Sequence, residues 1–173
     1  GNKGTGEITN QSTTTLPGGN TGVTSGAITF GSPTWSGGTA SITISSNQSY
    51  TIEYQKGTAE PVEANWTTIS NGGTVSGIAH GETVYARLTD GTNHGEYASI
   101  TITDTTKPTI TINDSAEGDI THESIKVNVT ASDGQTGLAT SNTYKYYLDN
   151  SLKQTTTETT YTFEGLTPKT SYS

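Results

Sequence analysis

The sequence contains no cysteine and no methionine, and only 14% of its 173 residues are charged. Without cysteine, the chain has no disulfide framework, no thiolate metal site and no thiol nucleophile. Basic residues are also scarce, because eight Lys and Arg stand against sixteen Asp and Glu, for a net charge of −8. Nucleic acids and anionic membrane surfaces are bound by clustered positive charge, so we expect neither partner.

Long apolar runs are missing as well. No segment approaches the length of a membrane-spanning helix or of the apolar core of a signal peptide. Hydrophobic residues make up only 28% of the chain, but its low charge argues against disorder, which combines low hydrophobicity with high charge density. Thr, Ser, Asn and Gly make up much of the rest of the sequence, and these residues favour exposed strand faces and tight turns. The composition therefore predicts a β protein with a modest core.

Apolar and polar residues alternate through most of the chain after residue 25. Residues 1–25 carry almost no apolar side chains, and we interpret them as a linker or N-terminal extension. Residues 31–38 ("GSPTWSGG") are expected to form a turn. Seven short strands are predicted, at residues 27–30, 39–46, 50–55, 65–70, 74–78, 83–90 and 96–104. This is the strand count of an immunoglobulin-like β-sandwich, which we assign to residues 26–104.

The second half of the chain repeats the first. Pro108 in "DTTKP" interrupts the alternation, so we place a domain boundary there and assign a second domain to residues 105–173. Four more strands are predicted, at residues 109–114, 124–133, 143–149 and 159–166.

The two halves align at their strands. The aligned pairs are 39–46 with 124–131, 50–55 with 144–149, Val75 with Phe163, Ile78 with Leu166, and Tyr85 with Tyr172. After Tyr85 the first copy continues through two strands to Asp104, whereas one residue follows Tyr172. We therefore expect the second domain to be C-terminally incomplete and to lack the counterparts of its last two strands.

Such a domain would expose an unpaired sheet edge and part of its core. We predict that the edge is covered in one of three ways: by a neighbouring copy of the chain, by residues 1–25, or by a rearranged sheet.

Several segments resemble known families. "GLTPKTSY" (165–172) resembles the turn of fibronectin type III domains, in which the Tyr opens the sixth strand and hydrogen-bonds back across a corner. "DTTKPTITI" and "VNVTASDGQTGLATSNTYKYYLD" resemble repeats of bacterial cell-surface proteins. The first half looks like a more divergent relative, with Trp66 after the third strand and His80 where Pro is expected. The resemblance implies two tandem immunoglobulin-like or fibronectin type III-like β-sandwiches in a secreted or cell-surface protein.

In these families the modules are spacers, adhesive stalks or accessory domains. The resemblance thus implies a non-catalytic extracellular module that positions neighbouring domains of the same polypeptide in adhesion. The alternative is a module that binds carbohydrate or a host protein through exposed aromatic rings. Its candidate contacts are Trp35, Trp66, Tyr97 and Tyr147, for which core and cross-strand packing is the competing explanation.

The sequence offers little for catalysis or for a cofactor. His80, His94 and His122 lie in or beside expected turns, outside any nucleophile or metal motif, so we expect no enzyme. No cofactor is expected either. The alternative is structural calcium bound at the acidic loops 113–119 and 132–137. The competing explanation is that acidic residues such as Asp90 and Asp133 cap their own turns through backbone hydrogen bonds.

Overall fold

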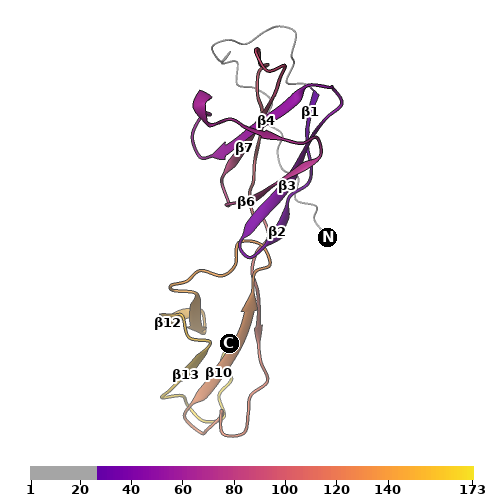
Figure 1. Cartoon of the computed structure of the whole chain (residues 1–173). Helices are drawn as coiled ribbons and strands as arrows, with labels where there is room; N and C mark the ends of the chain where they lie inside the picture. The colour runs from indigo at the N-terminus through magenta and orange to yellow at the C-terminus, as the bar shows by residue number, and fades with distance from the viewer. Residues whose placement is uncertain (1–26) are drawn as a thin grey trace. The chain divides into compact units, whose positions relative to one another are not determined.

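The structure, a computed structural model, describes residues 27–173 (Figure 1). The linker expected at residues 1–25 lies outside the described residues. The chain divides into two compact units, Gly1–Thr105 and Thr106–Ser173. The described residues form antiparallel strands and turns without an α-helix, which confirms the predicted all-β class. Residues 27–173 also contain no helix with the length and apolar character that a membrane span requires.

The described part of the first unit contains two sheets. Its strands are β1 (Ile28–Phe30), β2 (Thr34–Ser36), β3 (Thr39–Ser46), β4 (Thr51–Gly57), β5 (Thr67–Ile69), β6 (Gly73–Ile78), β7 (Thr83–Thr89) and β8 (Ala98–Thr101). In one sheet β3 pairs with β1, β2 and β6, and the other sheet has the order β5-β4-β7-β8.

The two sheets of this unit share one apolar core. Because side chains alternate along a strand, β3 contributes Ala40, Ile42 and Ile44 from one face. All three are at most 1% exposed. From the other sheet β7 contributes its own buried apolar residues at alternate positions, and these belong to the same core cluster. The alternation predicted for both strands is confirmed.

Strand β2 corrects the turn expected at residues 31–38. Trp35 pairs with Ala40 of β3, so the segment is a hairpin rather than a loop. Gly37 and Gly38 join the two strands with φ of 60° and 87°. Glycine adopts this left-handed region without a Cβ clash, and two-residue hairpin turns require it.

The second unit has two smaller sheets. Its strands are β9 (Thr109–Ile112), β10 (Ile125–Ser132), β11 (Tyr144–Leu148), β12 (Ser151–Thr156) and β13 (Thr160–Phe163). One sheet has the order β13-β10-β9, and β11 pairs with β12 in the other. The sequence prediction omitted β12. Asp149 and Asn150, with φ of 49° and 64°, form the two-residue turn before it, and its polar sequence shows little apolar alternation.

Strand pairing follows the internal repeat. The neighbours of β3 and β10 correspond, since β1 and β6 flank β3 as β9 and β13 flank β10. The register differs by two residues, because Val75 lies opposite Ile42 whereas Phe163 lies opposite Ile125 rather than Val127. A shift of two residues keeps both side chains on the core face.

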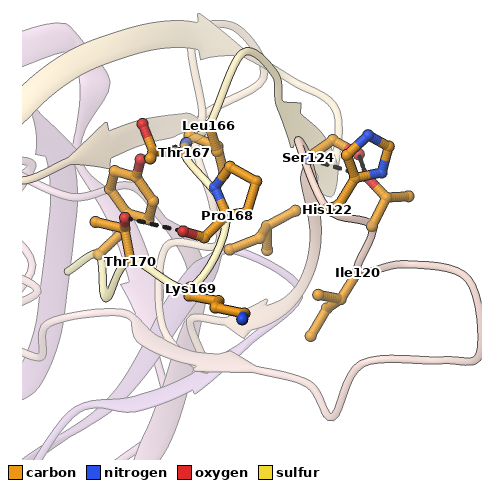
Figure 2. Close-up of a pocket in the computed structure, with 11 residues that line it drawn as sticks. Ile120, His122, Ser124, Leu166, Thr167, Pro168, Lys169 and Thr170 are labelled. Atoms are coloured by element: carbon orange, nitrogen blue, oxygen red, sulfur yellow. Dashed lines mark hydrogen bonds between the residues drawn. The ribbon is translucent and has the colours of Figure 1, made fainter.

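The corner near the end of the chain has the expected hydrogen bond. The backbone N–H of Thr167 donates to the hydroxyl of Tyr172 at 2.8 Å. Figure 2 shows Leu166, Thr167 and Pro168 of this corner beside a pocket. The side-chain-to-backbone bond fixes the direction in which Tyr172 leaves the turn.

One edge of the second unit lacks a strand partner. Strand β4 pairs with β5 and β7, whereas β11 pairs only with β12 within residues 106–173. A rearranged sheet, one of the three covers expected for this edge, is therefore not what the described residues form. Residues 1–25, the second expected cover, lie outside them, and a neighbouring copy stays a prediction.

Replacing a core residue of β3 should destabilise the first unit. We expect Ile44→Ala to cost about 2–5 kcal/mol, because it removes buried methyl groups and leaves a cavity. Trp35 and Trp66 are the chain's two tryptophans, so their fluorescence during urea unfolding follows this unit. The exposed neighbour Thr43 supplies the control, and Thr43→Ala should cost about 1 kcal/mol or less. Equal losses in the two variants would contradict the assigned core.

Candidate functional site

The outer face of the β5-β4-β7-β8 sheet carries a buried polar cluster. Strand β7 is buried on both faces, and Tyr85 and Arg87 alternate with its core residues. The Arg87 side chain is only 3% exposed, although it points away from the apolar core. A buried guanidinium must be paired, and its partners define the Arg87 cluster: Glu53, Glu63, Trp66, Arg87 and His94.

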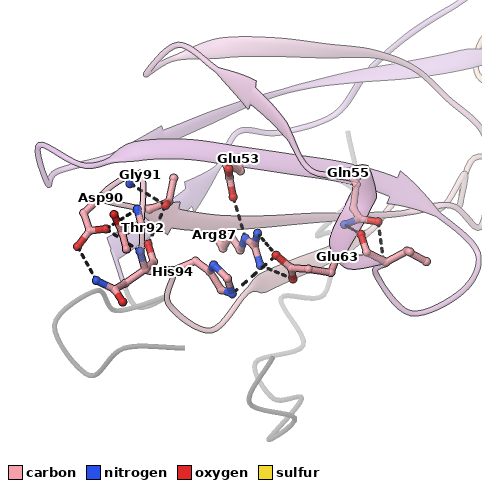
Figure 3. A network of polar contacts seen from close by, with 11 residues as sticks. Glu53, Gln55, Glu63, Arg87, Asp90, Gly91, Thr92 and His94 are labelled. Carbon is pink, nitrogen blue, oxygen red and sulfur yellow. Dashed lines mark hydrogen bonds and ion pairs between the residues drawn. The ribbon is translucent and has the colours of Figure 1, made fainter. Parts of the chain in front are cut away.

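Arg87 is paired on both sides of its guanidinium (Figure 3). Its Nε donates to Glu53 Oε2 at 2.8 Å. Its Nη1 and Nη2 donate to the two carboxylate oxygens of Glu63 at 2.9 and 2.8 Å, which is the bidentate arrangement. The guanidinium carbon also lies 4.2 Å from the centroid of the Trp66 ring, a cation–π contact.

These contacts keep the charges in place. Burial would lower the pKa of Arg87, but the hydrogen bonds to Glu63 and Glu53 outweigh it and raise that pKa above its ordinary value. The hydrogen bonds from Arg87 hold the pKa of Glu63 below its ordinary value of 4.5. The guanidinium and the Glu63 carboxylate are therefore both charged at neutral pH.

Aromatic contacts extend the cluster. The hydroxyl of Tyr97 donates to Glu60 Oε2 at 2.6 Å. The Tyr97 ring meets Tyr85 edge to face at 5.3 Å between centroids, and its centroid lies 6.4 Å from that of Trp66. Edge-to-face pairs of this kind are favourable because ring edges and ring faces carry opposite partial charge.

The cluster fastens the connection between β4 and β5, residues 58–66, to the sheet. Glu60, Glu63 and Trp66 all belong to this connection, and each contacts a residue on or next to β7 or β8. The side-chain amide of Gln55 adds two bonds to the backbone of Val62, at 3.0 and 2.9 Å. The connection is held at several separate points.

His94 lies at the margin of the cluster. It forms a bridge with Thr89, and its Nε2 is 3.8 Å from Glu63 Oε1. The Nε2 of His94 and the Nε1 of Trp66 are buried without a hydrogen-bond partner of normal geometry among the described residues. The Trp66 indole is still close enough to Glu63 to help lower its pKa.

The structure brings together two of the four aromatic residues proposed as ligand contacts. Trp66 and Tyr97 share the outer face, but the Arg87 guanidinium covers a face of Trp66, and Tyr97 is 8% exposed. Trp35 lies in the other sheet, half-buried against the core. Tyr147 belongs to the second unit and is 50% exposed.

Sequence reasoning missed Glu53, Glu63 and Arg87 as members of a site. The available signal was the chain's single arginine. It alternates with Val84, Ala86 and Leu88 in a strand whose apolar residues are typical of a central strand of a sheet. A cation on the second face of a central strand indicates that this face is also covered. The covering loop and the two carboxylates could not be identified from spacing.

The other histidines and the acidic turns have structural contacts. His80 Nδ1 accepts from the backbone N–H of Asp104 at 2.9 Å, and the His122 side chain is 78% exposed. Asp90 accepts from two backbone N–H groups of its turn and Asp133 from one, so the predicted capping is confirmed. Within residues 27–173, no three His, Asp or Glu side chains gather as a metal site would need.

Comparison with known proteins gave no match, either to models of protein families, to curated proteins or to solved structures. The functional interpretation therefore depends on the residues themselves.

Removing the guanidinium should loosen the first unit. We expect Arg87→Ala to cost about 3 kcal/mol in unfolding free energy, because Glu53 loses its partner and residues 58–66 lose their anchor. Arg87→Lys should recover only part of this loss, since an ammonium cannot form the bidentate fork. Lys56→Ala breaks the partly exposed 3.5 Å pair with Glu82 and a hydrogen bond to the Gly77 carbonyl, and it should cost about 1 kcal/mol. Full recovery by Lys would contradict the bidentate role.

Acid should weaken the same unit through Glu63. Its pKa in the folded chain lies below 4.5, so the stability it contributes is complete above that pH and is lost as the pH falls through the folded pKa. Urea unfolding followed by Trp fluorescence should show a declining midpoint below pH 4.5, and Glu63→Gln should flatten this decline. Glu123→Gln, at an exposed position in the second unit, should leave the decline unchanged. Parallel pH profiles for Glu63→Gln and the unmodified chain would refute the assignment.

Proposed function

We propose that the chain is a non-catalytic structural module of a bacterial extracellular surface protein. In this role it holds or presents neighbouring domains of the same polypeptide during adhesion. The two units are tandem immunoglobulin-like or fibronectin type III-like sandwiches, the second without the counterparts of β7 and β8.

The Arg87 cluster carries this proposal. The two hydrogen bonds from Arg87 to Glu63, the cation–π contact with Trp66 and the Tyr97–Glu60 bond tie residues 58–66 to the sheet, and the third Arg87 bond, to Glu53, joins β7 to β4. Polar and aromatic groups that could have served a ligand are used to close the surface of the unit. A loop held at several points resists deformation, which suits a module that transmits force or sets distance.

Two further observations support the assignment to these sandwich families. Pairing in the second unit repeats that of the first around β10, and β11 pairs with β12 as β4 pairs with β5. The bond from Thr167 N–H to the Tyr172 hydroxyl is the corner contact that fibronectin type III-like domains use before their sixth strand.

Binding of carbohydrate or of a host protein is the second candidate function, and one surface favours it. Tyr147 and Leu152 are cross-strand partners on β11 and β12, and each is 50% exposed. An exposed ring beside an apolar side chain can stack on a sugar face.

A display experiment tests the spacer role. The chain is inserted between a bacterial surface anchor and a peptide epitope, and antibody binding to the epitope is measured on intact cells. We expect greater access with the chain than without it, and less access with Arg87→Ala than with Lys56→Ala. Equal access with and without the chain would contradict the proposal.

A glycan array and a panel of matrix proteins test the second candidate. We expect no saturable binding by the unmodified chain. Saturable binding that Tyr147→Ala abolishes and Trp35→Ala preserves would replace the spacer role with recognition through β11 and β12.

A further inference from the structure

The turn between β5 and β6 contains the chain's single Asn–Gly pair, Asn71–Gly72. The backbone N–H of Gly73 donates to the carbonyl of Ser70 at 2.8 Å, which closes a β-turn around this pair. Of the two central residues only Gly72 has a positive φ, at 80°. This is the pattern of a type II turn, in which the third residue is usually glycine. The backbone of the turn therefore requires glycine directly after Asn71.

The side chain of Asn71 fastens this turn to β3. Its Oδ1 accepts from the backbone N–H of Ser46 at 3.0 Å, and its Nδ2 donates to the carbonyl of Ser46 at 2.7 Å. The carboxamide thus pairs with Ser46 as the peptide group of another strand would. Beside it, the backbone N–H of Gly72 donates to the carbonyl of Ile44 at 2.9 Å. Three hydrogen bonds hold the turn against β3.

The same two residues are a chemically reactive pair. The backbone nitrogen that follows an asparagine can attack the side-chain carbonyl carbon, so that a new C–N bond closes a five-membered succinimide ring. The attacking nitrogen loses its proton, and the side-chain amide leaves with that proton as ammonia. Water then opens the ring at either carbonyl and gives aspartate or isoaspartate. Glycine in the second position favours the attack because it has no side chain to obstruct its nitrogen.

The folded turn opposes this reaction at both reacting groups, although Asn71 and Gly72 are exposed to the water it needs. The nitrogen of Gly72 keeps its proton in the bond to Ile44. The carboxamide of Asn71 can turn toward that nitrogen only after both of its bonds to Ser46 have broken. The reaction therefore has to wait until the turn opens away from β3.

We propose that Asn71–Gly72 is a latent deamidation site. The closed turn suppresses formation of the succinimide, and each opening of the turn permits it. The product cannot restore the closed turn. An aspartate at position 71 still accepts from the N–H of Ser46, but it has no donor for the Ser46 carbonyl and places a negative charge against that oxygen. Isoaspartate also lengthens the backbone of the turn.

The modification has a structural consequence because of where the turn lies. Strand β5 belongs to the β5-β4-β7-β8 sheet, whereas β6 pairs with β3 in the other sheet. The turn is thus a connection between the two sheets of the first unit. Deamidation converts a transient opening of this connection into a permanent loss of its contacts with β3.

The rate of deamidation in the folded chain tests the proposal. The full chain and a synthetic peptide with the sequence of residues 67–77 are incubated at mildly alkaline pH. Conversion of Asn71 is followed by tandem mass spectrometry, in the chain after tryptic digestion. We expect Asn71 to react at least about tenfold more slowly in the chain than in the peptide, because only the open turn reacts. In urea that unfolds the first unit, the chain should react at the rate of the peptide in the same urea.

Two variants link the rate to opening of the turn. Ile44→Ala removes core contacts from the part of β3 that holds the turn, so it should speed deamidation of Asn71 at least about tenfold. Thr43→Ala, at the exposed neighbouring position, should leave the rate unchanged. If Ile44→Ala prevents folding, its rate should equal that of the peptide, and the order of the two variants stays the same.

A third variant tests the effect of the product. Asn71→Asp should speed hydrogen exchange at the amides of Ser46 and Gly72 at least about tenfold, because the turn is held less firmly against β3. Asn128→Asp makes the same chemical change at an exposed position in the second unit and should leave both amides unchanged.

Three results would overturn the proposal. One is deamidation of Asn71 at the same rate in the folded chain and in the peptide. Another is reaction at other asparagines, with Asn71 unreacted, in the unfolded chain. The third is unchanged exchange at Ser46 and Gly72 in Asn71→Asp, because the modification would then leave the turn as it was.

Discussion

Strand β7 carries apolar side chains toward the core and Arg87 toward the opposite face, and both faces are buried. Burying an isolated guanidinium costs several kcal/mol, so the strand is stable only with counter-charges on its outer side. Glu53 comes from the adjacent strand, but Glu63 must be delivered by the connection between β4 and β5. The path of residues 58–66 is thus a consequence of one buried charge.

This dependence shapes the surface of the first unit. Trp66 and Tyr97 would be natural platforms for a ligand, yet one covers the guanidinium and the other is buried against Tyr85. Their packing stabilises the unit, buries Tyr97 and leaves Trp66 half-buried. This arrangement is the observation that supports the proposed structural role.

The sequence predicts features that follow from the alternation of apolar and polar residues within one strand. It misses features that depend on contacts between separate segments of the chain. The apolar alternation of β3 and β7 placed Ile42, Ile44 and Leu88 in the core correctly, because a period of two is a property of the strand itself. Strand β12 was missed because its residues are mostly polar and its existence follows from the Asp149–Asn150 turn. The Arg87 cluster was missed for a similar reason, since its members come from separate segments that only the folded chain brings together.

The two units show how far burial is decided by a neighbouring strand. Among residues 27–173, twelve buried residues form the core cluster of the first unit and three form that of the second, although their strand patterns correspond. Phe30 and Ile112 occupy equivalent positions opposite Ile44 and Val129, and they differ in burial because only one of them lies near a β7. An apolar residue in a strand therefore predicts which face of the strand is buried, but it does not identify the segment that buries it. In the first unit the cover is part of the same fold, whereas Ile110 and Ile112 of the second unit are exposed among the described residues.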